Sequence, residues 1–396
     1  MQNAAGRTAL YSWVQGSFWM SFCVAVSFAA VYLQGLGYDN TALGAVLAAG
    51  NLLGAVLGPV LSSLVDRRED MSARRLIPWL LGVQALALVL VMAFPRKGIA
   101  AALGYGLYIA FSLSVNSLNL KLYVDFSYGG LPINYGLTRA MGSLFYVAAS
   151  MILGALSERF SIRVLPVAGL VLCASQAAAH YSLCALLPPE RTRGEKGGTG
   201  SSLTGFLGTH RRFAVLLLGT VLVFFAHNTV SSFLINITRS VGGNTRDMGY
   251  INSFMAAMEI PVMLFFTRLF ARRRTADLLR AAFAFFVLKT VAVMLAPSVV
   301  ALYAAFVLQA PSFALYTAAI VPYTEHSVPY RDAAKAQSLA FSTTTLGSVL
   351  ASLISGALLD RVSVRATLAV ACVVCAVGAA TAWCGIGKPS KQSECQ

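Results

Sequence analysis

The chain has 396 residues, of which 57% are hydrophobic and only 11% are charged, and its formal net charge is +15. Soluble domains carry about 25% charged residues, so this composition excludes an ordinary soluble protein with a large core. The Lys and Arg residues stand in short clusters between apolar runs, which is the positive-inside pattern of membrane proteins and not a nucleic-acid-binding patch. We therefore expect an all-α membrane protein that binds no nucleic acid.

Apolar runs of about 20 residues, the length that crosses a bilayer as a helix, recur along the whole chain. The first run is too long for a cleavable signal peptide, so we expect it to remain as a membrane helix. The runs predict twelve transmembrane helices, at 12–35, 41–65, 76–94, 99–122, 136–157, 164–187, 213–237, 248–269, 278–295, 298–321, 335–358 and 365–386.

The longest interruption between predicted spans is residues 188–212, a segment rich in Pro, Gly, Ser and charge. This composition is typical of a linker. We expect a cytoplasmic linker at 188–212, an N-terminal six-helix bundle at 1–187 and a C-terminal six-helix bundle at 213–396.

The two predicted bundles share short sequences at a constant offset. GALSERFSIRVL at 154–165 returns as GALLDRVSVRATL at 356–368, and YVDFS at 123–127 returns as YTEHS at 323–327. The offsets of about 200 residues place the matching pieces at equivalent spans. The pattern predicts two pseudo-symmetric six-helix bundles in parallel orientation.

The distribution of Lys and Arg predicts the orientation of the chain. With the N-terminus in the cytoplasm, the inside segments hold 20 of these residues and the outside segments hold 8. We expect an integral protein of the plasma (inner) membrane with both termini in the cytoplasm. The two cations that remain after this count, Arg139 and Lys289, stand inside predicted spans.

An acidic residue, Glu259, stands in the middle of the predicted span 248–269. A carboxylate at bilayer depth is costly, and such groups usually face a bundle interior or a water-filled path. Pro261 follows two residues later and is expected to bend the helix beside the charge. The combination predicts a working site, and the alternative is a protonated Glu that bonds to a neighbouring helix.

The predicted span four carries a polar and aromatic stripe at steps of three and four residues, so its members share one helix face. Spans one, seven and ten supply further hydroxyl, amide and aromatic groups. We favour a polar cavity lined by these side chains, and the alternative is hydrogen bonding between helices. The stripe consists of Tyr105, Tyr108, Ser112, Asn116, Asn119 and Tyr123.

Small residues and cysteines have packing interpretations. Gly50, Gly54 and Gly58 repeat every four residues in predicted span two, which indicates close approach of another helix. The seven cysteines lie mostly in apolar runs, and the CxxC of Cys372 and Cys375 has no second Cys pair. We expect no disulfide framework, metal or other cofactor, and the absence of a phosphate-binding loop or catalytic cluster argues against an enzyme.

The turn SSLVDRREDMSARR between predicted spans two and three resembles the Gly-x-x-x-Asp-Arg/Lys turn of the major facilitator superfamily. Asp66 and Arg67 occupy the matching positions, and Ser62 replaces the glycine. The resemblance implies two six-helix bundles and a gating role for Asp66 and Arg67. A solvated basic turn that only sets orientation is the alternative.

Three further segments are similar to the lactose-permease-like oligosaccharide and nucleoside proton symporters within that superfamily. They are YGLTRAMGS at 135–143, AMEIPVMLFF at 257–266 and PYTEHSVPYRDAAKAQ after Val321. The resemblance implies that Arg139 lies on the substrate side of span five and that Glu259 belongs to the site in span eight.

We predict a secondary active transporter that imports a small polar solute by proton-coupled symport, with sugar or oligosaccharide favoured and nucleoside next. Its expected partners are that solute, a coupling ion (H⁺) and membrane lipid, and we expect a monomer. The alternatives are an exporter, working by antiport, of amphipathic compounds or drugs, and a membrane sensor without transport activity.

The predicted site has three parts and no catalytic residue. Arg139 and Glu259 are expected to meet across the cavity, with Lys289 as a second partner of Glu259 and His227 as either a proton relay or a structural side chain. The gating residues are Asp66, Arg67, Asp125 and Glu325. The predicted solute-binding residues are Trp19, Tyr108, Ser112, Asn116, Asn119, Arg139, Asn228, Glu259, Gln309 and Tyr316.

Overall fold

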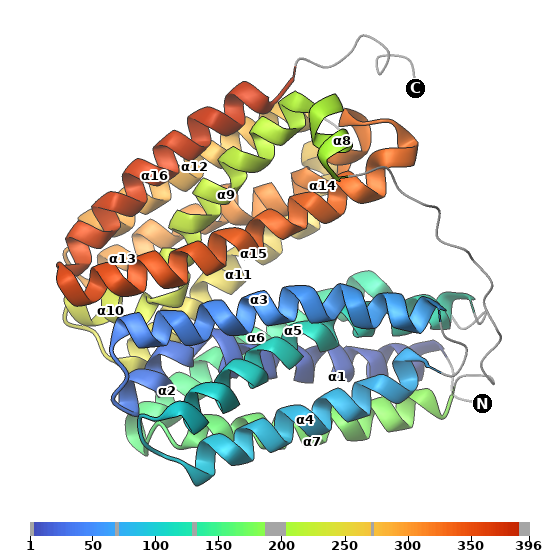
Figure 1. The fold of residues 1–396 in the computed structure, drawn as a ribbon, viewed down its shortest axis with the longest axis vertical. Coiled ribbons are helices and arrows are strands. Elements are labelled where there is room, and N and C mark those ends of the chain that lie inside the picture. Colours follow the sequence, from blue (N-terminus) through green and yellow to red (C-terminus); the bar gives the residue numbers. More distant parts are fainter. Residues whose placement is uncertain (1–3, 68–70, 129–132, 187–202, 271–272, 388–396) are drawn as a thin grey trace. The chain divides into compact units, whose positions relative to one another are not determined.

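The computed structural model describes residues 4–67, 71–128, 133–186, 203–270 and 273–387, and throughout these ranges the regular secondary structure is helical (Figure 1). Each of the twelve predicted spans coincides with one helix or with a short series of consecutive helices. The apolar runs therefore located the helices, because burial in lipid requires every backbone polar group to bond within its own segment.

Ten helices in the described ranges are long and apolar enough to cross a membrane. A bent pair, Ala5–Ser27 with Ala29–Gly35, makes eleven if it counts as one span. The helix over predicted span eight is not among them, and the side chains of its residues 266–270 lie outside the described part. The structure is that of an integral membrane protein, and the count of twelve spans remains a prediction.

The chain folds into two compact units. The first comprises Met1–Gly198 and Asn244–Ser253, and the second comprises Thr199–Gly243 and Phe254–Gln396. The division falls inside one helix, α11 (Thr245–Phe270), so that its first turns pack with the first unit. Most of the predicted linker lies outside the described residues.

In the first unit, α1 packs against α6 and α7, α3 packs against α5, and α4 packs against α5 and α7. Gly50, Gly54 and Gly58 of α3 face α5, where an added β-carbon would lie within 3.0 Å of an α5 atom at each position. This confirms the predicted close approach. The helices are α1 (Ala4–Phe22), η1 (Cys23–Ser27), α2 (Ala29–Gly35), α3 (Asn40–Arg67), α4 (Ala73–Ala93), α5 (Ile99–Tyr128), α6 (Tyr135–Arg159) and α7 (Val164–Cys184).

In the second unit, α9 lies between α15 and α16, and α12 packs against α14 and α16 (Figure 1). This arrangement repeats that of the first unit, in which the first span contacts the fifth and sixth. The elements are α8 (Leu203–Thr209), α9 (Arg211–Ser232), α10 (Leu234–Ser240), most of α11, α12 (Thr275–Leu295), α13 (Val299–Phe306), η2 (Val307–Gln309), η3 (Ala310–Ala314), α14 (Leu315–Ser327), α15 (Tyr330–Arg361) and α16 (Val364–Gly385).

Three of the described spans contain irregular turns, and in the seventh Phe233 separates α9 from α10. The first bends by 48° where the π-helical η1 separates α1 from α2. The tenth changes from α13 through η2 and η3 to α14, and Pro311 in η3 cannot donate to the helical ladder. By contrast, α11 runs through Pro261 as one uninterrupted helix. The irregular turns matter because Gln309, a predicted site residue, lies at the end of η2.

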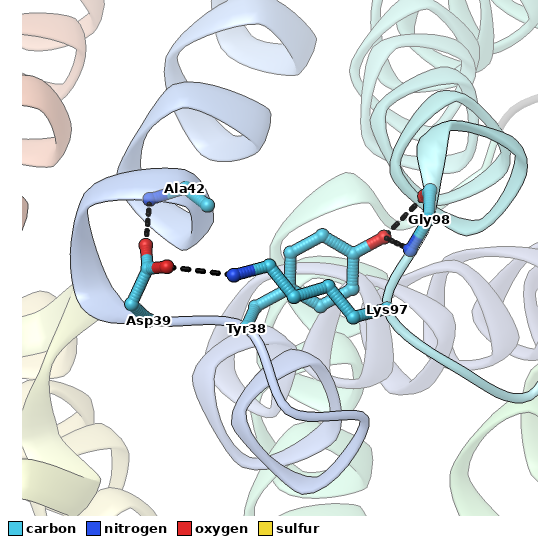
Figure 2. Close-up of polar contacts among 5 residues, drawn as sticks. All are labelled: Tyr38, Asp39, Ala42, Lys97 and Gly98. Atoms are coloured by element: carbon cyan, nitrogen blue, oxygen red, sulfur yellow. Dashed lines mark hydrogen bonds and ion pairs between the residues drawn. The ribbon is translucent and has the colours of Figure 1, made fainter.

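Hydrogen bonds and one ion pair join the loop after α2 to the loop before α5 (Figure 2). Asp39 accepts from the Ala42 amide at 2.7 Å, capping α3, and from Lys97 Nζ at 2.8 Å. Tyr38 Oη donates to the Gly98 carbonyl and accepts from the Gly98 amide at 3.0 Å. The hydrogen bonds from Lys97 and Ala42 hold the pKa of Asp39 below its usual value.

The first turns of α11 cross α6 at two glycines. A β-carbon on Gly249 would lie 2.6 Å from the Ser150 carbonyl oxygen and 2.8 Å from the Gly154 Cα. Hydrogen bonds accompany this approach: Ser150 Oγ donates to the Gly249 carbonyl at 2.9 Å, and Ser253 Oγ donates to the Val147 carbonyl at 2.8 Å. The small residues permit backbone contact that larger side chains would prevent.

Candidate functional site

Glu259 lies on α11 within the second unit and is half-buried. Its Oε1 accepts a hydrogen bond of 3.0 Å from Nε2 of Gln309. The carboxylate is therefore held by a neighbouring element of the same unit.

Lys289 on α12 is completely buried and connects to the same amide. Its Nζ donates to Gln309 Oε1 at 2.9 Å and lies 4.8 Å from the centre of the Phe286 ring. Because the amide oxygen accepts from Lys289, the amide nitrogen is the atom that reaches Glu259. Gln309 thus bridges a buried ammonium and a carboxylate.

His227 on α9 completes the chain of contacts. Its Nδ1 lies 3.0 Å from Lys289 Nζ, and its ring stacks on Phe313 at 4.8 Å between centres. An ammonium group has only donors, so His227 Nδ1 is the acceptor and the ring proton of neutral His227 lies on Nε2. We call Glu259, Gln309, Lys289 and His227 together the charge network. Its members lie on α11, η2, α12 and α9, respectively.

The arrangement of the charge network suits a reversible change. Buried charges are tolerated when they are paired and hydrogen-bonded, and removal of one partner is strongly destabilising. Here a neutral amide lies between the two charges, so a change at Glu259 reaches Lys289 through one rotatable side chain. The sequence predicted that Lys289 would partner Glu259, and the structure brings the two together through Gln309.

In the first unit, Arg139 on α6 lies over the indole of Trp19 on α1. The guanidinium carbon is 4.7 Å from the ring centre, and Nη1 donates to Ser143 Oγ at 3.1 Å. Both side chains are half-buried. Arg139 belongs to the first unit and Glu259 to the second, so their expected meeting across the cavity stays a prediction.

The predicted span-four stripe serves several different contacts. Tyr105 and Tyr108 donate to the carbonyls of Val24 and Ser21, at 2.8 and 2.9 Å. Ser112 Oγ donates to Gln84 Oε1 at 3.2 Å. Tyr108 and Ser112 are therefore bonded to neighbouring helices, which is the packing alternative for these two positions.

Asn116 and Asn119 of the same stripe differ in exposure. Asn116 is exposed, whereas Asn119 is fully buried, and neither amide atom of Asn119 has a hydrogen-bond partner among the described residues. A buried amide without a partner is costly, so Asn119 is a position where a bound water molecule would be stabilising.

The remaining predicted residues of the second unit lie close to the charge network. Asn228 Nδ2 donates to the Phe224 carbonyl at 2.8 Å. Tyr316 packs on Phe224 at 5.0 Å between ring centres, and its buried hydroxyl has no partner within the described ranges. Of the gating residues, Glu325 is exposed near the end of α14, and the side chains of Asp66, Arg67 and Asp125 lie outside the described residues.

Sequence reasoning missed three contributors to these contacts: Ser143, Phe286 and Phe313. Ser143 follows Arg139 by four residues, a spacing that places both on one face of a helix and that was available from the sequence. The two phenylalanines gave no signal, because an aromatic residue in an apolar run is indistinguishable from a lipid-facing one.

Residues 127–370, more than half of the chain, match the MFS_1 like family, and the chain belongs to this family. It is therefore a membrane transporter of the major facilitator type, which confirms the family expected from the sequence.

Two curated relatives share 25% identity with the chain. A protein of Escherichia coli strain K12, provisionally named a 3-phenylpropionic acid transporter, aligns over 268 residues, which are 66% of this chain and 68% of the relative. A protein of Deinococcus radiodurans, provisionally named a sugar efflux transporter, aligns over 342 residues, which are 82% of this chain and 84% of the relative.

Solved structures share the fold at lower identity. The nucleoside transporter NupG superposes with a TM-score of 0.79 at 15% identity, covering 98% of this chain and all of NupG. A bacterial homologue of the human lysosomal transporter Spinster superposes with a TM-score of 0.71 at 14% identity, covering 96% of each chain.

Proposed function

We propose that the protein is a proton-coupled symporter that imports a small polar solute by alternating access of its two bundles. The observation that carries the proposal is the charge network of the second unit, in which Gln309 joins Glu259 to Lys289 at 3.0 and 2.9 Å. The resemblance of 135–143 and 257–266 to the lactose-permease-like symporters supports the same assignment.

In this proposal, Glu259 exchanges the coupling proton. As a carboxylate it accepts from Gln309 and balances the charge of Lys289 through the amide. As a neutral acid it no longer balances that charge and is a weaker hydrogen-bond acceptor, so the Gln309 amide bonds more readily with a solute. Proton binding and solute binding then favour each other, which is the coupling that a symporter needs.

From the sequence, we favour a sugar or oligosaccharide as the solute, with a nucleoside as the next candidate. The curated relatives carry names that refer to an organic acid and to a sugar, so organic acids join the candidates. Predicted contacts to the solute come from Trp19 and Arg139 in the first unit and from Gln309 and Tyr316 in the second.

The direct test uses purified protein in vesicles, with solute-driven alkalinisation of the outer medium as the readout. Glu259→Gln should abolish accumulation of the solute against its gradient while exchange of labelled for unlabelled solute continues. Asp277→Asn, which removes an exposed carboxylate on α12, is the matched control and should leave both activities intact. Full accumulation in Glu259→Gln would count decisively against Glu259 as the proton site.

A second candidate function is export by antiport, which the efflux name of the Deinococcus relative favours. It predicts that a proton gradient directed into the vesicle drives solute outward. Deletion of the gene would then increase susceptibility to the exported compound.

A further inference from the structure

We propose that a cavity between α1 and α6 of the first unit binds one acyl chain of a membrane phospholipid. The cavity has a volume of about 730 Å³, and its walls are the α1 face from Ala5 to Trp13 and the α6 face from Leu137 to Phe145. Small-molecule sites usually measure roughly 300–1,000 Å³. No residue of the charge network and no predicted solute-binding residue lines this cavity, so it is a separate site.

The cavity is an elongated slot between two parallel stretches of helix. At its inner end Trp13 meets Phe145 edge-on, at 5.3 Å between ring centres. Phe145 lies directly on Gly16, where an added β-carbon would overlap the ring. Near its outer end, the Asn134 amide donates to Thr8 Oγ1 at 3.3 Å. Contacts between α1 and α6 therefore bound the slot at both ends.

The polar side chains of the lining are bonded within the protein. Thr8 accepts from the Asn134 amide, and Asn134 Oδ1 in turn accepts from the first turn of α6. Ser12 Oγ donates to the Thr8 carbonyl at 2.7 Å, and Trp13 Nε1 donates to Ser175 Oγ at 2.9 Å. No charged residue is among the lining residues. A polar solute would have to compete with these hydrogen bonds, whereas a hydrocarbon chain leaves them intact.

The depth of the slot matches one leaflet of a bilayer. Leu137 and Phe145 stand one and nine residues inside the predicted span 136–157. At about 1.5 Å per residue, the slot ends about 13 Å from the start of this span. Half of the hydrocarbon core measures roughly 15 Å. An acyl chain that extends from the membrane surface toward the midplane therefore has the length that the slot accommodates.

The walls of the slot continue into an exposed apolar surface. Leu137 is 51% exposed and begins a stripe of exposed side chains at seven-residue steps, followed by Leu144 and Met151. Trp13 on the opposite wall is 43% exposed. Lipid tails are as apolar as leucine, so a chain in the bilayer enters from this face without passing a charged group.

Native mass spectrometry of the purified full-length protein tests the proposal. During stepwise removal of lipid by detergent, one phospholipid per protein should remain bound after the others are lost. Ala9→Phe places a ring in the slot and should reduce the retained lipid several-fold. Ala178→Phe, at an exposed position of α7 outside the cavity, is the matched control and should retain it. Equal retention in the two variants, or no retained lipid in the parent protein, would overturn the proposal.

Photo-cross-linking tests the site without a substitution, which decides the matter if Ala9→Phe does not fold. A phospholipid with a photoreactive group at the end of one acyl chain is incorporated into vesicles with the parent protein. Cross-links should concentrate on Met141 and Phe145 rather than on Trp79 and Leu86, which are 75% and 68% exposed on α4. An even distribution over these four positions would show that the slot holds no lipid of its own.

Two other occupants are distinguished by the same measurements. Loss of the cross-links to Met141 and Phe145 when 3-phenylpropionate is added would identify the cavity as a solute site and contradict the lipid assignment. A dimer in the native spectra that Ala9→Phe converts to a monomer would identify a second copy of the chain as the occupant. Neither result depends on whether the protein couples transport to protons, so the proposed function is tested separately.

Discussion

The amide of Gln309 has one orientation that satisfies both of its neighbours. Its oxygen faces the ammonium of Lys289 and its nitrogen faces the carboxylate of Glu259. A side chain that can only donate or only accept would leave one of these charges without its hydrogen bond. Gln309 is therefore the residue whose replacement separates the two charges.

Replacement of Gln309 by Leu should destabilise the protein by about 1.5–3 kcal/mol for each hydrogen bond to a charged group that is lost. Thermal unfolding in detergent measures the effect. The double variant Gln309→Leu with Lys289→Met removes the buried ammonium as well, so it should lose less stability than the sum of the single variants. A simple sum would show that Gln309 and Lys289 act independently.

Because the pKa of Asp39 is lowered in the folded protein, we expect the stability of the protein to depend slightly on pH. Its pKa is lowered by Lys97 and by the Ala42 amide, so the stabilisation is present above the unfolded carboxyl value, about 3.9, and is lost as pH falls through the folded value. Asp39→Asn keeps the helix cap but loses the ion pair. The melting temperature of this variant should be slightly lower than that of the parent protein at pH 7, and the difference should shrink as pH falls below about 3.9.

The effect of Asp39→Asn is small because the side chains of Lys97 and Asp39 are 50% and 49% exposed. Asp39→Ala removes the cap together with the ion pair and should cost about 1 kcal/mol more. A difference between the parent protein and Asp39→Asn that persists undiminished at pH 3 would show that the ion pair is not its source.

At the scale of the helix, the close crossing of α3 with α5 could be predicted from the sequence, whereas the irregular turn in the first span could not. The four-residue spacing of the glycines in α3 predicted that another helix would approach closely, and the structure shows that this helix is α5. The bend after Phe22 had no such signal, since η1 consists of CVAVS without Gly or Pro. Hydropathy thus locates a span, while the turns inside it depend on neighbours that are distant in sequence.

Substitution of Gly249 tests the crossing of α11 with α6. Gly249→Ala forces backbone atoms apart, because the new methyl group would lie within 3 Å of Ser150 and Gly154. We expect a loss of stability of about 1–3 kcal/mol, the range for overpacking. Gly82→Ala on α4 is the control, since nothing lies within 4 Å of its β-carbon, and its melting temperature should be unchanged or higher.

The candidate site shows a similar limit of sequence reasoning. Glu259, Lys289 and Arg139 were recognisable because charges within apolar runs are rare and functional. Gln309 was predicted as a solute contact but not as the bridge between Glu259 and Lys289, since it is separated from Glu259 by 50 residues and no pattern along the chain connects them.

At the scale of the whole molecule, the Lys and Arg distribution predicts the position of both termini. The excess of 20 over 8 favours cytoplasmic termini. A reporter enzyme that is active only in the cytoplasm should be active when fused after Gln396, and a reporter that is active only outside should be inactive there. The opposite pair of results would reverse the orientation of every span.

The division of α11 has a consequence for dissecting the protein. A fragment that stops at Gly198 lacks residues 244–253, and its Tyr146 and Ser150 would lose the hydrogen bonds that Asn252 donates to them at 2.9 Å. If the chain is cut at the linker, we therefore expect that neither piece folds stably by itself. Co-expression of the two pieces should restore activity by complementation, whereas each piece alone should be cleared by cellular proteolysis.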